Sequence, residues 1–177
     1  SMTASGYPRV LKRWRRGTPL HEATTLFEVD VEDVGLGVSV DHTPGHERTV
    51  FTRAVDFFHE KRVLLQGGRR FELDLPDDAE FEFWNHAGST EDTLLIGLRS
   101  ELRIGDRTHP AGSLLATDAG AWLRGERHAA VLFEPTATRS LAGYVTTRRH
   151  VILEVLDTVA SRLEEWRRGR RGFVRRE

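Results

Sequence analysis

The sequence contains no cysteine among its 177 residues. This absence excludes disulfides, cysteine-ligated zinc and a thiol nucleophile, and it fits a reducing compartment, so we expect a cytoplasmic protein. Lysine is almost missing as well, since Lys12 and Lys61 are the only two and arginine supplies nearly all of the positive charge. No apolar run approaches the roughly 20 residues that would cross a membrane, and nothing resembles a signal peptide, so we expect no membrane partner.

The chain also lacks an excess of charge of either sign. Its formal net charge is −1, although 30% of its residues are charged and 38% are hydrophobic. Such a balance gives no global field toward nucleic acid, so we expect no nucleic-acid partner. A high charged fraction with modest apolar content is typical of many short strands that each have one wetted face.

The two ends of the chain are expected to differ from its middle. The opening Ser1-Met2 is typical of a cloning remnant, which suggests an excised fragment, and we expect residues 1–4 to be disordered. Residues 5–168 are expected to form one domain or part of one. The Arg-rich segment 169–177 is expected to be a solvated, frayed tail, which leaves room for one last strand around Phe173-Val174.

Short strands separated by turns are predicted along most of the chain. Residues alternate between apolar and small or polar types in Val34–Val40 and Glu80–Trp84, which is the two-residue period of a strand. Gly67-Gly68 between two β-rich runs indicates a tight hairpin. About eleven strands at this spacing favour an all-β sandwich or propeller. Further strands are expected at Tyr7–Arg16, Thr24–Val29, Thr49–Phe58, Lys61–Gln66, Arg70–Leu75 and Leu141–Thr147, and a loop at Gly88-Ser89-Thr90.

The stretch from Leu94 to Pro135 contains two apolar runs, Leu94–Leu98 and Ala129–Phe133. We interpret it as a β-hairpin with a long decorated loop. Within that loop, residues 118–125 have the pattern of one or two turns of helix, so one short helix is predicted there.

Candidate chemical sites in the sequence all have plainer interpretations. His42 and His46 have a helical ligand spacing, but Pro44-Gly45 between them makes a turn. Asp77-Asp78 lacks the regularly spaced oxygen ligands that calcium needs. Three histidines beside apolar runs are interpreted as surface or hydrogen-bonded residues, namely His109, His128 and His150. We therefore predict no metal site and no cofactor.

Four segments, in their order and spacing, resemble the β-propeller domain of the prolyl oligopeptidase family of serine peptidases. They are SGYPRVLKRWRRGTPLHEATTLFE (5–28), DHTPGHERTVFTRAVDFF (41–58), GDRTHPAGSLLATDAGAWLRGE (105–126) and VLFEPTATRSLAGYVTTRRHVILEVLD (131–157). The resemblance implies four-stranded antiparallel blades of about 40–50 residues, so the chain has room for about three and a half blades of a partial β-propeller.

The resemblance also decides between two interpretations of His150–Arg168. The apolar residues there fall at helical spacing, which by itself predicts an amphipathic helix. The family pattern implies two strands, Val151–Leu156 and Ala160–Arg167, joined by a tight turn at Asp157-Thr158. We predict strands because the preceding segment continues the resemblance without a break.

In this family a propeller caps an α/β-hydrolase domain and admits only short peptides. The chemistry requires a serine on a Gly-x-Ser-x-Gly elbow, followed by aspartate and histidine. Ser39 has Gly37 before it but no second glycine after it, and no other serine fits. We therefore assign no catalytic residue and expect the chain to be inactive alone. The implied partners are the hydrolase domain of a parent peptidase and, through it, short proline-containing peptides.

Arginine clusters are the one functional surface that the sequence suggests. If they face a propeller channel, Arg9, Arg13, Arg148 and Arg149 would attract peptide carboxylates. The alternative is that they are solvated strand edges that discourage aggregation. A second hypothesis for the whole chain is a stand-alone all-β interaction module that binds a partner, or forms a homodimer, through open strand edges.

Overall fold

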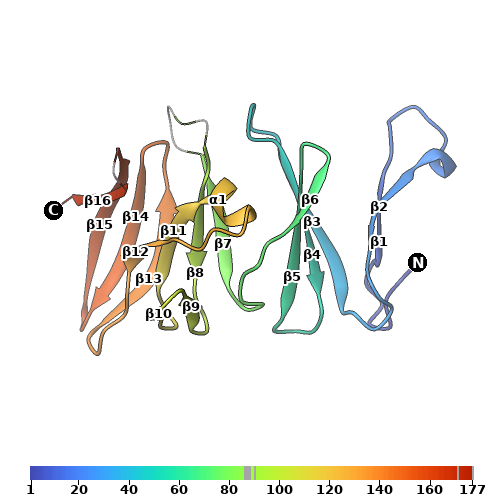
Figure 1. Cartoon of the computed structure of the whole chain (residues 1–177). Coiled ribbons are helices and arrows are strands. Elements are labelled where there is room, and N and C mark those ends of the chain that lie inside the picture. The colour runs from blue at the N-terminus through green and yellow to red at the C-terminus, as the bar shows by residue number, and fades with distance from the viewer. Residues whose placement is uncertain (86–88, 90, 171, 177) are drawn as a thin grey trace. The chain divides into compact units, whose positions relative to one another are not determined.

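In the computed structural model of the chain, residues 1–85, 89, 91–170 and 172–176 are described. The Gly88-Ser89-Thr90 loop expected from the sequence therefore falls mostly outside the described residues. The chain divides into two compact units, Ser1–Asp77 and Asp78–Glu177, and each is described by itself. Both are built almost entirely of antiparallel strands, which confirms the all-β prediction (Figure 1).

The first unit begins with a two-stranded antiparallel sheet. Strand β1 (Val10–Arg13) pairs with β2 (Thr24–Glu28), and the 3-10 turn η1 (Leu20–Glu22) lies between them. Strand β1 is shorter than the Tyr7–Arg16 segment predicted from its apolar residues, because the chain leaves the sheet at Trp14 and turns at Gly17. The pair is the half-blade expected from the sequence.

Residues 1–4 have more structure than the predicted disorder. Thr3 is buried, and its hydroxyl donates a hydrogen bond of 3.0 Å to the carbonyl of Val34. Met2 forms a bridge with Pro8. These contacts tie the start of the chain to the strands of the first unit.

A four-stranded meander completes the first unit. Its strands follow one another in the order β3-β4-β5-β6, and their bounds are Gly35–Asp41, Arg48–Ala54, Glu60–Gln66 and Arg69–Glu72. Phe51 in β4 is 1% exposed and stacks on Phe27 of β2, with ring centroids 4.8 Å apart. This offset packing of two aromatic rings joins the meander to the two-stranded sheet.

The β5–β6 hairpin has the turn that its glycines predicted. Gln66 pairs with Arg69, so Gly67 and Gly68 are the two central residues of the turn. Both have positive φ angles, 57° and 77°, which is the backbone conformation of a type I′ turn.

Substituting Gly68 with alanine is expected to lower the unfolding free energy of the first unit by about 1–2 kcal/mol, because a Cβ is strained at this positive φ. Urea denaturation of the two proteins checks it. Gly37→Ala is the control, since Gly37 lies within β3 and its added Cβ would meet Thr52 at an ordinary 3.8 Å. Equal losses in both variants would contradict the prediction.

The first sheet of the second unit has the strand order β12-β11-β8-β7. The bounds of its members in chain order are Glu80–Trp84 (β7), Thr93–Gly97 (β8), Leu114–Asp118 (β11) and Ala130–Phe133 (β12). The expected hairpin between Leu94–Leu98 and Ala129–Phe133 is therefore wrong in its pairing, because β11 lies between these two strands and pairs with both. Strands β8 and β11 are buried on both faces, so neither shows the alternation that reveals a strand.

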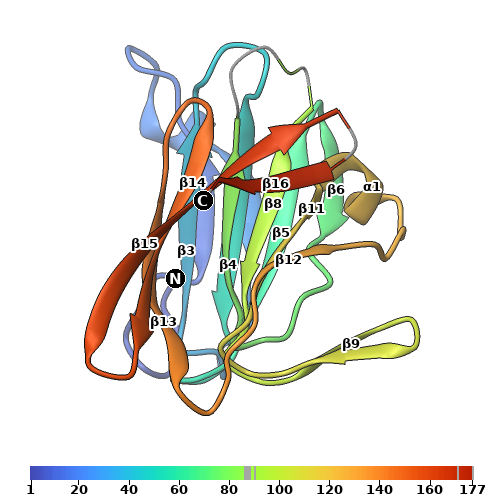
Figure 2. The same ribbon diagram turned by 90° about the vertical axis from the view of Figure 1, so that its left-hand side faces the viewer.

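The decorated loop between β8 and β11 contains a further hairpin of β9 (Leu102–Ile104) and β10 (Arg107–His109), which projects from the sheet (Figure 2). After β11 comes the short helix α1 (Ala119–Leu123), as the sequence predicted. Asp118 is its N-cap, and Oδ1 accepts a hydrogen bond of 2.7 Å from the Ala121 N–H.

The second sheet of this unit is the meander β13-β14-β15-β16. Its strands are Arg139–Thr146, His150–Asp157, Ala160–Gly169 and Gly172–Arg176. The helical interpretation of His150–Arg168 is thus wrong and the two-strand prediction is confirmed, with Thr158 at φ 60° in the tight turn. The tail forms the last strand, β16, whose Phe173 packs against the core, so the described part of 169–177 is not frayed.

The core of the second unit lies between its two sheets. Trp84, Leu95 and Leu114 of one sheet and Val151, Leu153 and Val155 of the other are at most 3% exposed. In the described residues the two units contain three four-stranded antiparallel sheets, the β1–β2 pair and the small β9–β10 hairpin. The three sheets and the β1–β2 pair agree with about three and a half blades.

Candidate functional site

Strand β7 places two carboxylates and a tryptophan on the same face. Because side chains alternate along a strand, Glu80, Glu82 and Trp84 share one face, while Phe81 and Phe83 take the other. The Thr146 hydroxyl donates a hydrogen bond of 2.6 Å to Glu82 Oε1, and Trp84 Nε1 donates one of 2.6 Å to the carbonyl of Thr147. The face with the carboxylates therefore packs against strand β13 and the turn after it.

A tyrosine from β13 completes this polar contact. Burial raises the pKa of Tyr144, and the negative charges of Glu82 and Glu80 together with a hydrogen bond to Glu82 raise it further. The phenol is consequently protonated at all physiological pH values and acts as a hydrogen-bond donor. Glu82 thus accepts from two hydroxyl groups, which stabilises a carboxylate at the junction of two sheets.

A cleft of about 230 Å³ lies beside these residues. Glu80 and Tyr144 line it together with Arg99, which forms an ion pair with Glu80. The side chains of Glu80 and Arg99 are 60% and 67% exposed, so both charges are accessible to a ligand. The backbone at Gly97, Gly112 and Gly143 forms part of the wall. The cleft can offer a carboxylate, a guanidinium and a phenol to a polar ligand such as a peptide.

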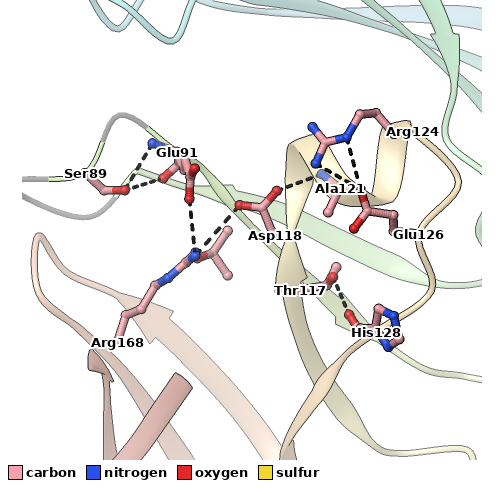
Figure 3. A network of polar contacts seen from close by, with 10 residues as sticks. Ser89, Glu91, Thr117, Asp118, Ala121, Arg124, Glu126, His128 and Arg168 are labelled. Carbon is pink, nitrogen blue, oxygen red and sulfur yellow. Dashed lines mark hydrogen bonds and ion pairs between the residues drawn. The ribbon is translucent and has the colours of Figure 1, made fainter. Parts of the chain in front are cut away.

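A second polar cluster, centred on Arg168 of β15, joins the two sheets farther along (Figure 3). Arg168 Nη1 donates a hydrogen bond of 2.9 Å to Thr93 Oγ1 in β8. Its Nη2 lies 3.6 Å from Glu91 Oε2 and 3.7 Å from Asp118 Oδ2. Since Asp118 also caps α1, one guanidinium connects the β15–β16 hairpin to both the β8 strand and the start of the helix.

The predicted peptide-facing arginines fall at two places. Arg9 precedes β1 and is held by Glu28 and by the carbonyl of Val29, which Nε reaches at 3.1 Å, whereas Arg13 at the end of β1 is exposed. Arg148 and Arg149 are neighbours in the turn between β13 and β14, and both are exposed. Arg9 and Arg13 thus lie at opposite ends of β1, Arg148 and Arg149 share one turn, and the role of all four stays a prediction.

The charged groups of the cleft were missed from the sequence. In the sequence, Glu80 and Glu82 stand out only as polar positions in the alternation of Glu80–Trp84. The signal was Trp84, a large aromatic in register with them, because a face that carries a tryptophan in a strand is more often covered than solvated. Arg99 gave no sequence signal, since it reaches Glu80 from the connection after β8.

The turn and metal interpretations can be compared with the structure. His46 N–H donates to the Thr43 carbonyl at 2.9 Å and Gly45 has a φ of 83°, so residues 42–46 form a turn. Ser39 lies in mid-strand in β3 and is exposed, which is unlike a strand-to-helix elbow. Within residues 1–85, 89, 91–170 and 172–176, no group of three or more histidine, aspartate or glutamate side chains could hold a metal ion.

His109 at the end of β10 differs from its predicted surface or hydrogen-bonded setting. It is 3% exposed, and its Nδ1 is buried with no hydrogen-bond partner in the described part of the chain. Burial lowers its pKa, the charge of Arg107 lowers it further, and Glu134 opposes them. Arg107 and Glu134 themselves form an ion pair of 2.6 Å.

We expect the second unit to lose stability as the pH falls. Because the folded state lowers the pKa of His109, the unfolded chain takes up this proton first, near pH 6.5, and the unfolding free energy declines below that pH. Urea denaturation at pH 7.5 and 5.5 checks this. His109→Gln should flatten this part of the pH dependence, and an unchanged pH dependence in that variant would contradict the assignment.

Comparison with known proteins places these sheets in a wider context. No protein-family model matches the sequence. An uncharacterised peptidase of Sinorhizobium fredii is 28% identical over 181 residues, which cover 97% of this chain and 24% of that protein. An uncharacterised peptidase of Rickettsia prowazekii is 28% identical over 171 residues, which cover 92% of this chain and 23% of that protein.

Among solved structures, that of a post-proline cleaving enzyme from Rickettsia typhi is similar, with a TM-score of 0.82 and 23% identity. The match covers 98% of this chain and 26% of that one, so the chain spans about a quarter of the length of the proteins that it matches. The likeness confirms the propeller-type fold, and the similarity to the two peptidases agrees with the resemblance stated from the sequence. In the described residues, no helix is long and apolar enough to cross a membrane.

Proposed function

We propose that this chain is part of the propeller of a proline-specific serine peptidase and gates its substrates without carrying the nucleophile. The observation that carries the proposal is the match of 98% of the chain to about a quarter of a post-proline cleaving enzyme. The similarity to two peptidases supports it. The serine, histidine and aspartate would lie in an α/β-hydrolase domain elsewhere in a longer cytoplasmic polypeptide, because the chain has no Gly-x-Ser-x-Gly elbow.

In this proposal the propeller limits the size of the peptides that reach the serine. The cleft beside Glu80, Arg99 and Tyr144 contributes polar groups to the substrate cavity, and Arg9, Arg13, Arg148 and Arg149 attract peptide carboxylates. In the chemistry itself the serine oxygen attacks the carbonyl carbon of proline, with histidine as base and aspartate orienting it. The bond from that carbon to the nitrogen of the next residue breaks, the amine leaves with the proton from histidine, and water then hydrolyses the acyl-enzyme ester. None of the three catalytic roles, those of serine, histidine and aspartate, requires a residue of this chain.

The test compares the 177-residue chain with the longer polypeptide. A fluorogenic peptide with proline at the cleaved position and a fluorophosphonate probe are given to both. We expect the longer polypeptide to cleave the peptide and to become labelled at one serine, and the chain alone to do neither. Labelling of a serine within residues 1–177, or a longer polypeptide without activity, would contradict the proposal.

A second candidate function, a stand-alone interaction module, is favoured by one observation. The register of β13–β16 places Val145, Leu156, Leu163 and Val174 on the sheet face opposite the core, and they are 60%, 40%, 76% and 48% exposed. Such a face is typical of a covered surface. In the first proposal a following blade covers it, whereas in the second a partner or a second copy does. A molecular mass that stays monomeric at all concentrations would exclude the homodimer.

A further inference from the structure

The loop between β4 and β5 carries two adjacent phenylalanines whose side chains are largely exposed. Phe57 and Phe58 are 84% and 80% exposed, the highest values among the exposed aromatic side chains of the described residues. A phenylalanine buries roughly 150–250 Å² when it is covered, so the pair forms a compact apolar tip. An exposed apolar patch of a few hundred Å² is often a contact surface.

The tip is held rigid by the aspartate that precedes it. Asp56 Oδ1 accepts hydrogen bonds from the N–H groups of Phe58 at 2.7 Å and His59 at 2.8 Å, and His59 Nδ1 lies 2.8 Å from Asp56 Oδ2. The loop closes where the Val55 N–H donates to the His59 carbonyl at 3.0 Å. A loop ordered before it binds loses less conformational entropy on binding, which is a property of docking elements.

The chemistry around the tip distinguishes between its occupants. Residues 55–59 contain no lysine or arginine, and Asp56 stands directly beside the two rings. An anionic membrane surface attracts basic loops, so this composition disfavours a lipid partner. This chain covers 24% and 26% of the lengths of two matched proteins, so a polypeptide of their length would supply a covalently linked protein surface at high effective concentration.

We propose that the tip formed by Asp56–His59 is a docking element that inserts Phe57 and Phe58 into an apolar pocket of the same longer polypeptide, outside residues 1–177. This inference rests on the proposed function for the existence of that polypeptide, but it does not depend on peptidase activity. The two rings anchor the contact, and Asp56 and His59 fix the direction in which the rings leave the loop.

Photo-crosslinking in the longer polypeptide tests the proposal. Phe58 is replaced with p-benzoylphenylalanine, the sample is irradiated in the presence of anionic vesicles, and the crosslinked peptides are mapped by mass spectrometry. The proposal expects a crosslink to a residue of the same polypeptide outside 1–177. A crosslink within 1–177, to lipid or to a second copy, or no crosslink at all, would overturn it. The same probe at Leu20, which is 76% exposed on η1, is the matched control and should not give that crosslink.

Hydrogen exchange provides an independent measurement of the same contact. Backbone amides of residues 55–60 should exchange more than about tenfold more slowly in the longer polypeptide than in the 177-residue chain, because docking must be broken before the tip opens. Phe57→Ala/Phe58→Ala should remove that difference, and equal exchange in the two unsubstituted proteins would overturn the proposal. Peptide hydrolysis is measured on the same preparations. Cleavage without slower amide exchange at residues 55–60 would contradict only this inference. Slower exchange without cleavage would contradict only the proposed function.

Discussion

Replacing Trp84 with alanine is expected to lower the unfolding free energy of the Asp78–Glu177 unit by about 3–5 kcal/mol. The indole is 3% exposed and belongs to the core between the two sheets, where it also lies against Phe173 with ring centroids 6.4 Å apart. Alanine at position 84 would leave a cavity in the core between the two sheets, next to Phe173. It would also leave the Thr147 carbonyl without the 2.6 Å hydrogen bond from Nε1.

Urea denaturation followed by the fluorescence of Trp122 and Trp166, which remain in the same unit, measures the effect. Trp84→Phe is the matched control, because it keeps most of the apolar volume and loses the hydrogen bond. Its expected loss is smaller, about 1–2 kcal/mol. Equal losses in Trp84→Ala and Trp84→Phe would contradict the prediction. They would mean that the hydrogen bond, and not the packing of the indole, accounts for most of the stabilisation by Trp84.

Replacing Arg168 with methionine is expected to lower the unfolding free energy of the same unit by about 1.5–3 kcal/mol. The guanidinium is 24% exposed and is the cation beside Asp118 Oδ2, a buried oxygen with no hydrogen-bond partner in the described part of the chain. Methionine keeps the aliphatic stem but removes the guanidinium that lies 3.7 Å from that oxygen. The loss should therefore exceed that of an ordinary surface arginine.

The matched control is Arg167→Met, the neighbouring residue in β15. Arg167 is exposed and, by strand alternation, projects to the other face of the sheet. We expect a change within about 0.5 kcal/mol there. Asp118→Asn in the Arg168→Met background should recover part of the loss, because it removes the uncompensated charge. Equal stability of the two arginine variants would show that the cluster in Figure 3 contributes little.

Local features of the sequence predicted the elements that depend on neighbouring residues. Gly67-Gly68 specified the type I′ hairpin because both positions require positive φ, and the alternation in Glu80–Trp84 specified β7 to the residue. The short helix after Asp118 followed from a cap and a few helix-forming residues. For His150–Arg168 local periodicity favoured a helix, and cross-strand pairing overrode it, since β14 pairs with both β13 and β15.

The amino-acid sequence by itself determined the all-β class, the blade-like rhythm of strands and turns, and the absence of a nucleophile elbow, because each depends on residue types at short spacing. Only the tertiary structure decided that β11 lies between β8 and β12, that Glu80 and Glu82 face β13, and that Arg168 reaches Thr93, 75 residues away. These contacts join segments far apart in the chain. Their free energy comes from burial and charge pairing that exist only after the sheets have packed, so no local pattern encodes them.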